Sequence, residues 1–451
     1  MSALIYKIPF FMSLFFFALV WGWTFFDIFP YDASRWIEAM VLSASFPMAM
    51  AAVWRKSKHL VAGAFPLLIA AVCYLISIWG SDVGWYSWVL GVRFLMWLAL
   101  FVSSVDWYAR MGEREAGLCA AAFIVISFSY SSYVLIGNAV LLGSGIYDRS
   151  FLASGFSNVN HAAAFAAIST LVMPAMACKA SSVGRIFPIL STYTASVYVL
   201  FISIMESRGA WIAILVAPLI VLILLRSGGI FNYIRRIFLY LLGGLSLFLV
   251  FQIARVMLGV YGHGSEKSFF SDSGRWVLYG EGLKGTLEKP FFGSGPLSYA
   301  AMDNVSLGHP HNILISSLYE NGMVFTVFFC SFLFFVLYKI IKESSGTTDD
   351  VAAVSGLVVI FYFVVHSMFS GLSMIPSTVF VLLVGVSLVC GKAWKGSEVE
   401  VVSARNRSFL FFLGGAISVV YMLLVCSYWN AIPVHGEQKT RFWIEGGIEK
   451  L

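Results

Sequence analysis

Three side chains, Arg208, Arg275 and His311, carry most of the chemistry that this sequence offers. A planar guanidinium binds pyrophosphate oxygens bidentately and stays charged at any physiological pH. A neutral histidine can accept a proton from an attacking hydroxyl. Together the three suit displacement of a lipid pyrophosphate from a sugar, with the arginines stabilising the leaving group and the histidine activating the nucleophile.

Each of these residues also has a plainer interpretation. Arg208 could snorkel to lipid phosphates at a helix end, with Glu206 as its partner. Arg275 could contact headgroups from the start of an amphipathic helix, and His311 could cap a helix. Glu320 lies in the apolar run after His311, where a helix-surface or packing role is expected.

The pair His309 and His311 raises the question of a metal site. Pro310 separates the two histidines, so they lack the i, i+4 helical spacing of zinc ligands, and no cysteine lies near them. Asp272 and Asp303 are the nearest carboxylates. We therefore expect no metal and no cofactor.

The composition is that of an integral membrane protein. Of the 451 residues, 60% are hydrophobic and only 12% are charged, and the mean hydropathy is +0.86. A soluble protein carries roughly 25% charged residues. The net charge is +6, but the basic residues lie at the ends of apolar segments and form no patch. This excludes a nucleic-acid partner. The six cysteines lie in or beside apolar runs, so no disulfide framework is expected.

Apolar runs of membrane-spanning length recur along the chain and predict an all-α protein with about 12–13 transmembrane helices. The first run is interpreted as a retained anchor, because no cleavage site of small residues follows it. The runs lie near residues 10–29, 36–53, 59–79, 84–104, 116–136, 158–178, 186–204, 209–226, 236–258, 323–341, 351–370, 375–391 and 408–428.

Loop charges predict the orientation, because short cytoplasmic loops collect Lys and Arg. With the N-terminus inside, Arg208 and the long polar loop face outside, and an odd number of spans would put the tail after Trp429 there too. The predicted organisation is an N-terminal bundle of about nine helices (1–258), a loop (259–322), C-terminal helices (323–428) and a short tail (429–451). The basic residues expected inside are Lys7, Arg55, Lys56, Lys58, Arg110, Arg114, Lys179, Arg185, Arg226, Arg235, Arg236, Lys339, Lys342, Lys392, Lys395, Arg405 and Arg407.

The polar loop contains a predicted amphipathic helix over residues 275–287. Ser271-Asp272-Ser273 supplies the N-cap chemistry, and an apolar stripe recurs at helical spacing, which predicts a helix lying in the headgroup layer. The stripe consists of Trp276, Tyr279, Leu283 and Leu287. His311 and Asn312 then precede another apolar run and are expected near a helix N-terminus, where anionic groups are favoured.

Polar residues within the spans are expected to be structural. Arg93 lies in the middle of a span and requires a buried acid as partner, or else contact with the phosphates of a lipid carrier. His161 and His366 are predicted to be packed and hydrogen-bonded in the interior.

Taken in order, these motifs resemble the O-antigen ligase/polymerase superfamily. The resemblance lies in Ser207-Arg208-Gly209-Ala210, in Gly274-Arg275-Trp276, and in the segment from Gly293-Ser294-Gly295 to His309-Pro310-His311-Asn312. The family's ligase pattern is His, then Asn, Ser or Gln, nine residues, Gly, two residues, and Gly, Thr or Tyr. His311, Asn312 and Gly322 match this pattern, whereas Phe325 departs from it at the last position.

The resemblance implies a multi-pass glycosyltransferase of the bacterial inner membrane with a GT-C-like helical fold. Such enzymes take a glycan from undecaprenyl pyrophosphate on the periplasmic face, with inversion and without a metal. The segment 259–322 would then be a periplasmic catalytic loop. By motif match His311 would be the general base and Arg208 and Arg275 the pyrophosphate-binding residues, with Asn312 and His309 assigned to the same diphosphate.

Three functions remain open, and the leading one is an O-antigen ligase with lipid A–core as the acceptor. The short tail after Trp429 favours this branch over the protein O-oligosaccharyltransferases, which resemble it but usually add a periplasmic domain. A repeat-unit polymerase, in which a growing glycan is the acceptor, uses the same donor. A transporter of lipid-linked sugars is disfavoured, since charged residues gather in one loop instead of lining a path through the bundle.

Overall fold

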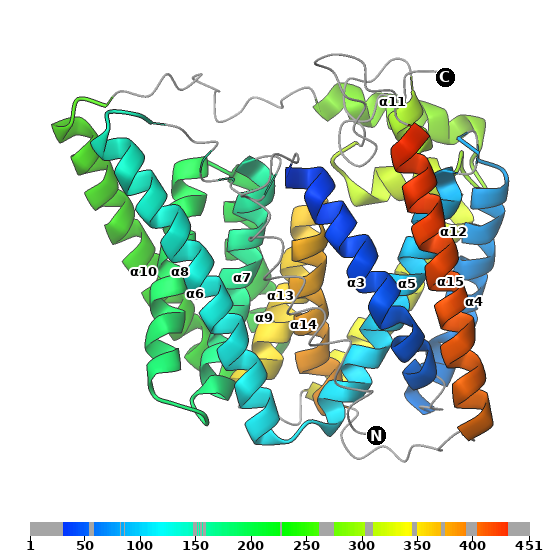
Figure 1. Ribbon diagram of the computed structural model, residues 1–451, viewed down its shortest axis with the longest axis horizontal. Helices are drawn as coiled ribbons and strands as arrows, with labels where there is room; N and C mark the ends of the chain where they lie inside the picture. The colour runs from blue at the N-terminus through cyan, green and yellow to red at the C-terminus, as the bar shows by residue number, and fades with distance from the viewer. Residues whose placement is uncertain are drawn as a thin grey trace.

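The structure is a computed structural model in which all regular secondary structure of the described residues is helical (Figure 1). Helix labels follow Figure 1. The structure describes residues 30–53, 58–81, 83–84, 86–147, 151, 153, 156, 159–225, 228–260, 275–302, 310–344, 350–370, 375–393 and 404–431.

Twelve of the thirteen apolar runs coincide with a helix, and the run at 10–29 lies outside the described residues. The helices that carry these runs are α3 (Pro30–Val53), α4 (Lys58–Trp79), α5 (Tyr86–Arg110), α6 (Glu113–Gly143), α7 (Val159–Ala180), α8 (Ile186–Met205), α9 (Arg208–Leu225), α10 (Gly228–Met257), α12 (Ile313–Ser344), α13 (Val351–Ser367), α14 (Pro376–Ala393) and α15 (Ala404–Ala431).

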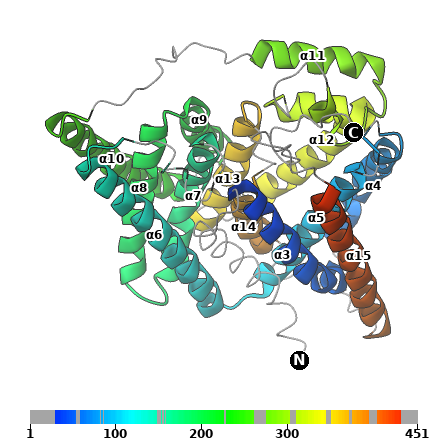
Figure 2. The same cartoon turned by 45° about the horizontal axis from the view of Figure 1, so that its top comes forward.

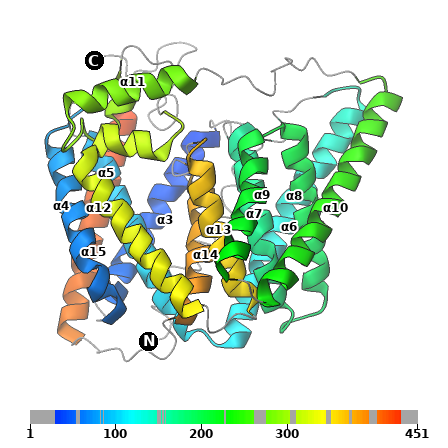
Figure 3. The same ribbon diagram turned by 180° about the vertical axis from the view of Figure 1, so that it is seen from behind.

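The chain is an all-α, multi-pass membrane protein. Within the described part, eight helices are long and apolar enough to cross a membrane. Shorter apolar stretches lie in α3, α4, α13 and α14, so the expected 12–13 spans correspond to these two groups together. Prolines 174 and 218 lie inside α7 and α9, where packed neighbours tolerate them. Successive helices run in alternating directions (Figures 1 and 3).

The helices form two groups joined by a central pair. Helices α6 to α10 stand on one side and α3, α4, α5, α12 and α15 on the other, with α13 and α14 between them (Figures 1 and 3). Helix α13 packs on α7 and α9, while α14 packs on α5. Helices α13 and α14, which follow the polar loop in the sequence, therefore pack between helices that precede it. The C-terminal end of α13 lies beside the start of α9.

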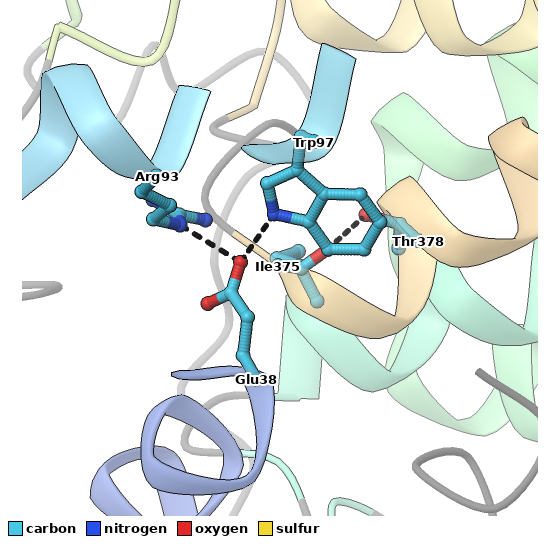
Figure 4. Close-up of polar contacts among 5 residues, drawn as sticks. All are labelled: Glu38, Arg93, Trp97, Ile375 and Thr378. Atoms are coloured by element: carbon cyan, nitrogen blue, oxygen red, sulfur yellow. Dashed lines mark hydrogen bonds and ion pairs between the residues drawn. The ribbon is translucent and has the colours of Figure 1, made fainter. Parts of the chain in front are cut away.

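A buried ion pair confirms the structural interpretation of Arg93. Its Nε lies 2.7 Å from Oε1 of Glu38, which also accepts a hydrogen bond of 2.6 Å from Trp97 Nε1 (Figure 4). The Arg93 and Glu38 side chains are both almost fully buried. The pair joins α5 to α3 and compensates the charge that each would otherwise bring into an apolar interior.

Helix α11 (Arg275–Glu288) confirms the predicted helix of the polar loop and lies across one end of the bundle (Figure 2). Its buried face consists of Leu278, Gly282 and Gly285, which pack on α12. A Cβ on Gly282 would lie 2.7 Å from Ile315. Of the predicted stripe, Trp276, Leu283 and Leu287 are exposed on the protein surface, which suits a face that contacts headgroups, whereas Tyr279 is half-buried.

Candidate functional site

The three residues singled out by their chemistry lie at one end of the bundle. Arg208 is the first residue of α9 and Arg275 the first residue of α11, while His311 lies two residues before α12. Helices α9 and α12 both begin at the end across which α11 lies (Figures 1 and 3). The segments that carry the arginines and the histidine therefore share a face, as the loop charges predicted.

These segments converge on the C-terminal end of α13. A Cβ built on Gly209, next to Arg208, would lie 3.2 Å from Nε2 of His366. The carbonyl of Met368 accepts hydrogen bonds from Tyr279 of α11, at 3.5 Å, and from the Asn312 amide, at 3.3 Å. The side chain of His366 and the carbonyl of Met368, at one end of α13, thus lie against all three motif segments.

Asn312 holds the start of α12 in place. Its Oδ1 accepts hydrogen bonds from the backbone N–H groups of Leu314, at 3.0 Å, and Ile315, at 3.2 Å, as an N-cap residue does. Its Nδ2 donates to Met368, as described above. The structure gives Asn312 a capping and linking role, and its assignment to the diphosphate stays a prediction.

His311 has a left-handed backbone conformation, with a φ of 55°. A residue other than glycine rarely adopts this conformation, because it is strained. It persists only where the surrounding structure holds the backbone in place. Buried Pro310 precedes it and the Asn312 cap follows. The half-buried imidazole is thus fixed at a sharp turn directly before α12, whereas His309 lies outside the described residues.

The motif glycine, Gly322, breaks α12. Its backbone (φ 79°, ψ 172°) is open essentially to glycine alone, and a Cβ there would clash with the carbonyl of Phe291. The break frees backbone groups that must be paired in an apolar environment. Residues 290–297, here called the strap, pair them through Ser294 N–H to Tyr319 O (2.9 Å), Gly295 N–H to Glu320 O (2.8 Å), Met323 N–H to Pro290 O (2.7 Å) and Val324 N–H to Phe291 O (3.3 Å).

Glu320 fixes the strap, in agreement with the packing role expected for it. Its Oε1 accepts a hydrogen bond of 3.1 Å from Leu297 N–H, and its backbone carbonyl accepts one of 2.7 Å from the Ser77 hydroxyl on α4. Burial raises the pKa of Tyr299, so its hydroxyl stays protonated and donates to Leu278 O of α11 at 2.8 Å. Through Glu320, and through Tyr299 just after the strap, this region connects α4, α11 and the broken α12.

The departure at Phe325 has a packing explanation. Its ring is buried, stacks on Phe329 with centroids 5.3 Å apart, and lies 5.4 Å from the ring of Tyr74 on α4. An aromatic side chain here fills the contact between α12 and α4. The position lies on the spanning part of α12, beyond the break at Gly322.

The electrostatics of this end favour an anion. The N-terminal ends of α9, α11 and α12 lie at this end of the bundle, and each carries the positive partial charge of a helix start. Arg208 and Arg275 add two full positive charges. Of the acids near these arginines, Glu281 is engaged with Lys284 at 2.7 Å, and Glu206 lies two residues before Arg208 at the end of α8. A diphosphate matches this distribution of charge.

His366 is the site residue whose position the sequence did not reveal. Its ring is buried, as predicted, yet it lies at the convergence point beside Gly209 and within electrostatic reach of Arg275. One feature of the sequence could have indicated this position. His366 lies near the end of the run at 351–370, and the alternation of spans places that end on the same side of the membrane as Arg208. Periodicity alone could not show which neighbours it meets.

The described residues contain no group of three His, Cys, Asp or Glu side chains that could hold a metal ion. The six cysteines are free. Because His309, Asp303 and Asp272 lie outside the described part, the absence of a metal remains a prediction.

Residues 193–330 match the family described as O-antigen ligase. The matched stretch runs from α8 into α12 and includes Arg208, Arg275 and His311. No curated protein matches the chain. Members of this family are glycosyltransferase-like enzymes that act on lipid-linked glycans. Between residues 193 and 330, the chain therefore carries a domain of the O-antigen ligase/polymerase superfamily.

Proposed function

We propose that this protein transfers a polysaccharide from undecaprenyl pyrophosphate to a sugar hydroxyl of lipid A–core at the periplasmic face of the bacterial inner membrane. The observation that supports this most is the convergence of the three motif segments on the end of α13, through Gly209, Tyr279 and Asn312. It places two arginine-bearing helix starts and the turn of His311 around one anion-attracting end of the bundle.

In the proposed reaction, an acceptor hydroxyl attacks the anomeric carbon of the lipid-linked sugar from the side opposite the diphosphate. The new carbon–oxygen bond forms as the bond to the diphosphate oxygen breaks, so the configuration inverts. His311 takes the hydroxyl proton, and undecaprenyl pyrophosphate leaves with the bonding electron pair. Arg208 and Arg275 stabilise the negative charge that grows on this leaving group.

The distribution of basic residues supports the proposed sidedness. Arg110, Lys179 and Lys342 lie in the last turns of α5, α7 and α12, at the end of the bundle opposite to α11. Cytoplasmic ends collect such residues, so the α11 end is assigned to the periplasm.

Complementation of a ligase-null strain tests the proposal. We expect Arg208→Ala, Arg275→Ala and His311→Ala each to abolish capping of lipid A–core with polymer while the protein still accumulates in the membrane. Lys284→Ala on α11 and Arg255→Ala on α10 are matched controls and should cap normally. Lys284 is paired with Glu281 on the surface, and Arg255 is held by Gln252 and the ring of Tyr147.

Two results would redirect the assignment. Core capped with single repeats in a knockout, with loss of long lipid-linked chains, would identify a repeat-unit polymerase with the same donor. Capping that persists in all three site variants would refute the proposed chemistry. Translocation of a lipid-linked sugar by those variants would then favour the transporter.

A further inference from the structure

A buried Tyr362–His366 pair at the outer end of α13 is not accounted for by the three motif residues. The Tyr362 hydroxyl lies 2.6 Å from Nδ1 of His366 and donates to the carbonyl of Ala164 on α7, at 3.2 Å. Both side chains are buried. The Tyr362 hydroxyl therefore holds the ring of His366 and connects it to α7.

The two contacts of Tyr362 together specify the tautomer of His366. A phenol has one proton, and the Ala164 carbonyl can only accept one. Both contacts are satisfied at once only if Nδ1–H donates to the phenol oxygen. Nε2 then carries a lone pair and can only accept a hydrogen bond.

That lone pair faces the starts of α9 and α11. Nε2 would lie 3.2 Å from a Cβ on Gly209, so no side chain of α9 intervenes at this position. Tyr279, one turn after Arg275 on α11, reaches Met368 O, two residues beyond His366. Arg275 thus lies on α11 within one turn of the residue that contacts the end of α13 beside His366. Within the described part of the chain, Nε2 makes no hydrogen bond.

We infer that His366 is a positioning residue, whose Nε2 accepts a hydrogen bond from the Arg275 guanidinium when a diphosphate occupies the site. The inference rests on the proposed function. A guanidinium has five N–H donors, so it can grip two phosphate oxygens and still direct one N–H at Nε2. Tyr362 holds the imidazole so that Nε2 faces Arg275. The hydrogen bond to Nε2 then orients the Arg275 guanidinium toward the diphosphate leaving group.

A double-mutant cycle tests this role in the full-length protein in nanodiscs, with undecaprenyl pyrophosphate as the probe. His366→Phe keeps a ring against Gly209 and removes both nitrogens, while Tyr362 retains the Ala164 carbonyl as acceptor. We expect His366→Phe to raise Kd by about tenfold, the size of a hydrogen bond to a charged group. His366→Gln, with an amide near the place of Nε2, should recover part of this loss.

The cycle separates positioning from packing. In an Arg275→Ala background, His366→Phe should change Kd by less than twofold, because the interaction it removes is already gone. Equal losses in both backgrounds, an unchanged Kd for His366→Phe, or no recovery by glutamine would each overturn the inference. Binding that depends on Arg275 but not on His366 refutes this role alone. Wild-type protein that fails to bind the probe refutes the proposed function as well.

Discussion

At the scale of single residues, the motif asparagine has two separable tasks. Its oxygen caps α12 and its amide nitrogen links α12 to Met368. Asn312→Ser retains a good cap but is too short to keep the link. We expect the serine variant to unfold within a few degrees of wild type yet lose at least tenfold in glycan transfer, measured with purified protein.

Asn312→Ala is the companion variant, because it removes both tasks and should cost about 1 kcal/mol of stability in addition. A serine variant as active as wild type would show that the link to Met368 does not matter for the site.

The pair of Glu38 and Arg93 supports another prediction at this scale. Glu38→Gln keeps an acceptor for Trp97 but leaves Arg93 buried without its counter-charge, which should destabilise the protein by about 3–5 kcal/mol. The double variant Glu38→Gln with Arg93→Met removes the stranded charge and should recover most of this loss. Thermal unfolding in detergent measures both, and a double variant less stable than Glu38→Gln alone would contradict the explanation.

The sequence predicted that Arg93 needs an acid but could not identify Glu38. The requirement follows from the cost of an unpaired charge in an apolar span. The choice of partner depends on which faces of α3 and α5 meet, and every span in this chain is apolar on several faces. For the same reason the sequence could not place His366, which lies beside Gly209 of α9 and is joined through Tyr362 to Ala164 of α7.

At the scale of elements, the break in α12 and the strap form one unit. Gly322→Ala would place a Cβ against the Phe291 carbonyl in a backbone region reserved for glycine. We expect a loss of more than about 3 kcal/mol, because strain and displaced strap hydrogen bonds add. Thermal unfolding together with limited proteolysis near residues 290–297 would report both effects.

Gly415→Ala in α15 is the matched control, since a Cβ there meets nothing within 4 Å. It should be neutral or stabilise by about 0.5–1 kcal/mol, as alanine for glycine does inside a helix. Equal behaviour of the two variants would mean that the break at Gly322 is not enforced by the strap.

The helices themselves were largely predictable from sequence. Apolar length found the spans, and the N-cap and turn residues bounded α11 almost as observed. The span was predicted to begin at residue 323, but the helical residues before it, the break at Gly322 and its pairing with residues 290–297 were not predicted. The break in α12 is tolerated because the strap pairs the backbone groups that the break leaves without helical partners.

At the scale of the whole molecule, α13 of the central pair lies where the motif segments of the proposed site meet. Helix α13 begins with the Asp350 side chain accepting a hydrogen bond from Ala352 N–H at 2.8 Å, at the end opposite to α11. It ends among the motif segments. Arg208, Arg275 and His311 lie within the matched residues 193–330, whereas α13, which would complete the proposed site, lies outside them.

The same architecture predicts which residues face each side of the membrane. Lys284 is exposed on α11, and Ser182 is exposed in the turn between α7 and α8, at the opposite end. In cells with a permeabilised outer membrane, a membrane-impermeant maleimide should label Lys284→Cys at once and Ser182→Cys only after lysis, because reagent reaches only the periplasmic face. The parent chain measures the background, since its six cysteines all lie within helices. Labelling in the reverse order would put Arg208, Arg275 and His311 in the cytoplasm, away from the proposed donor.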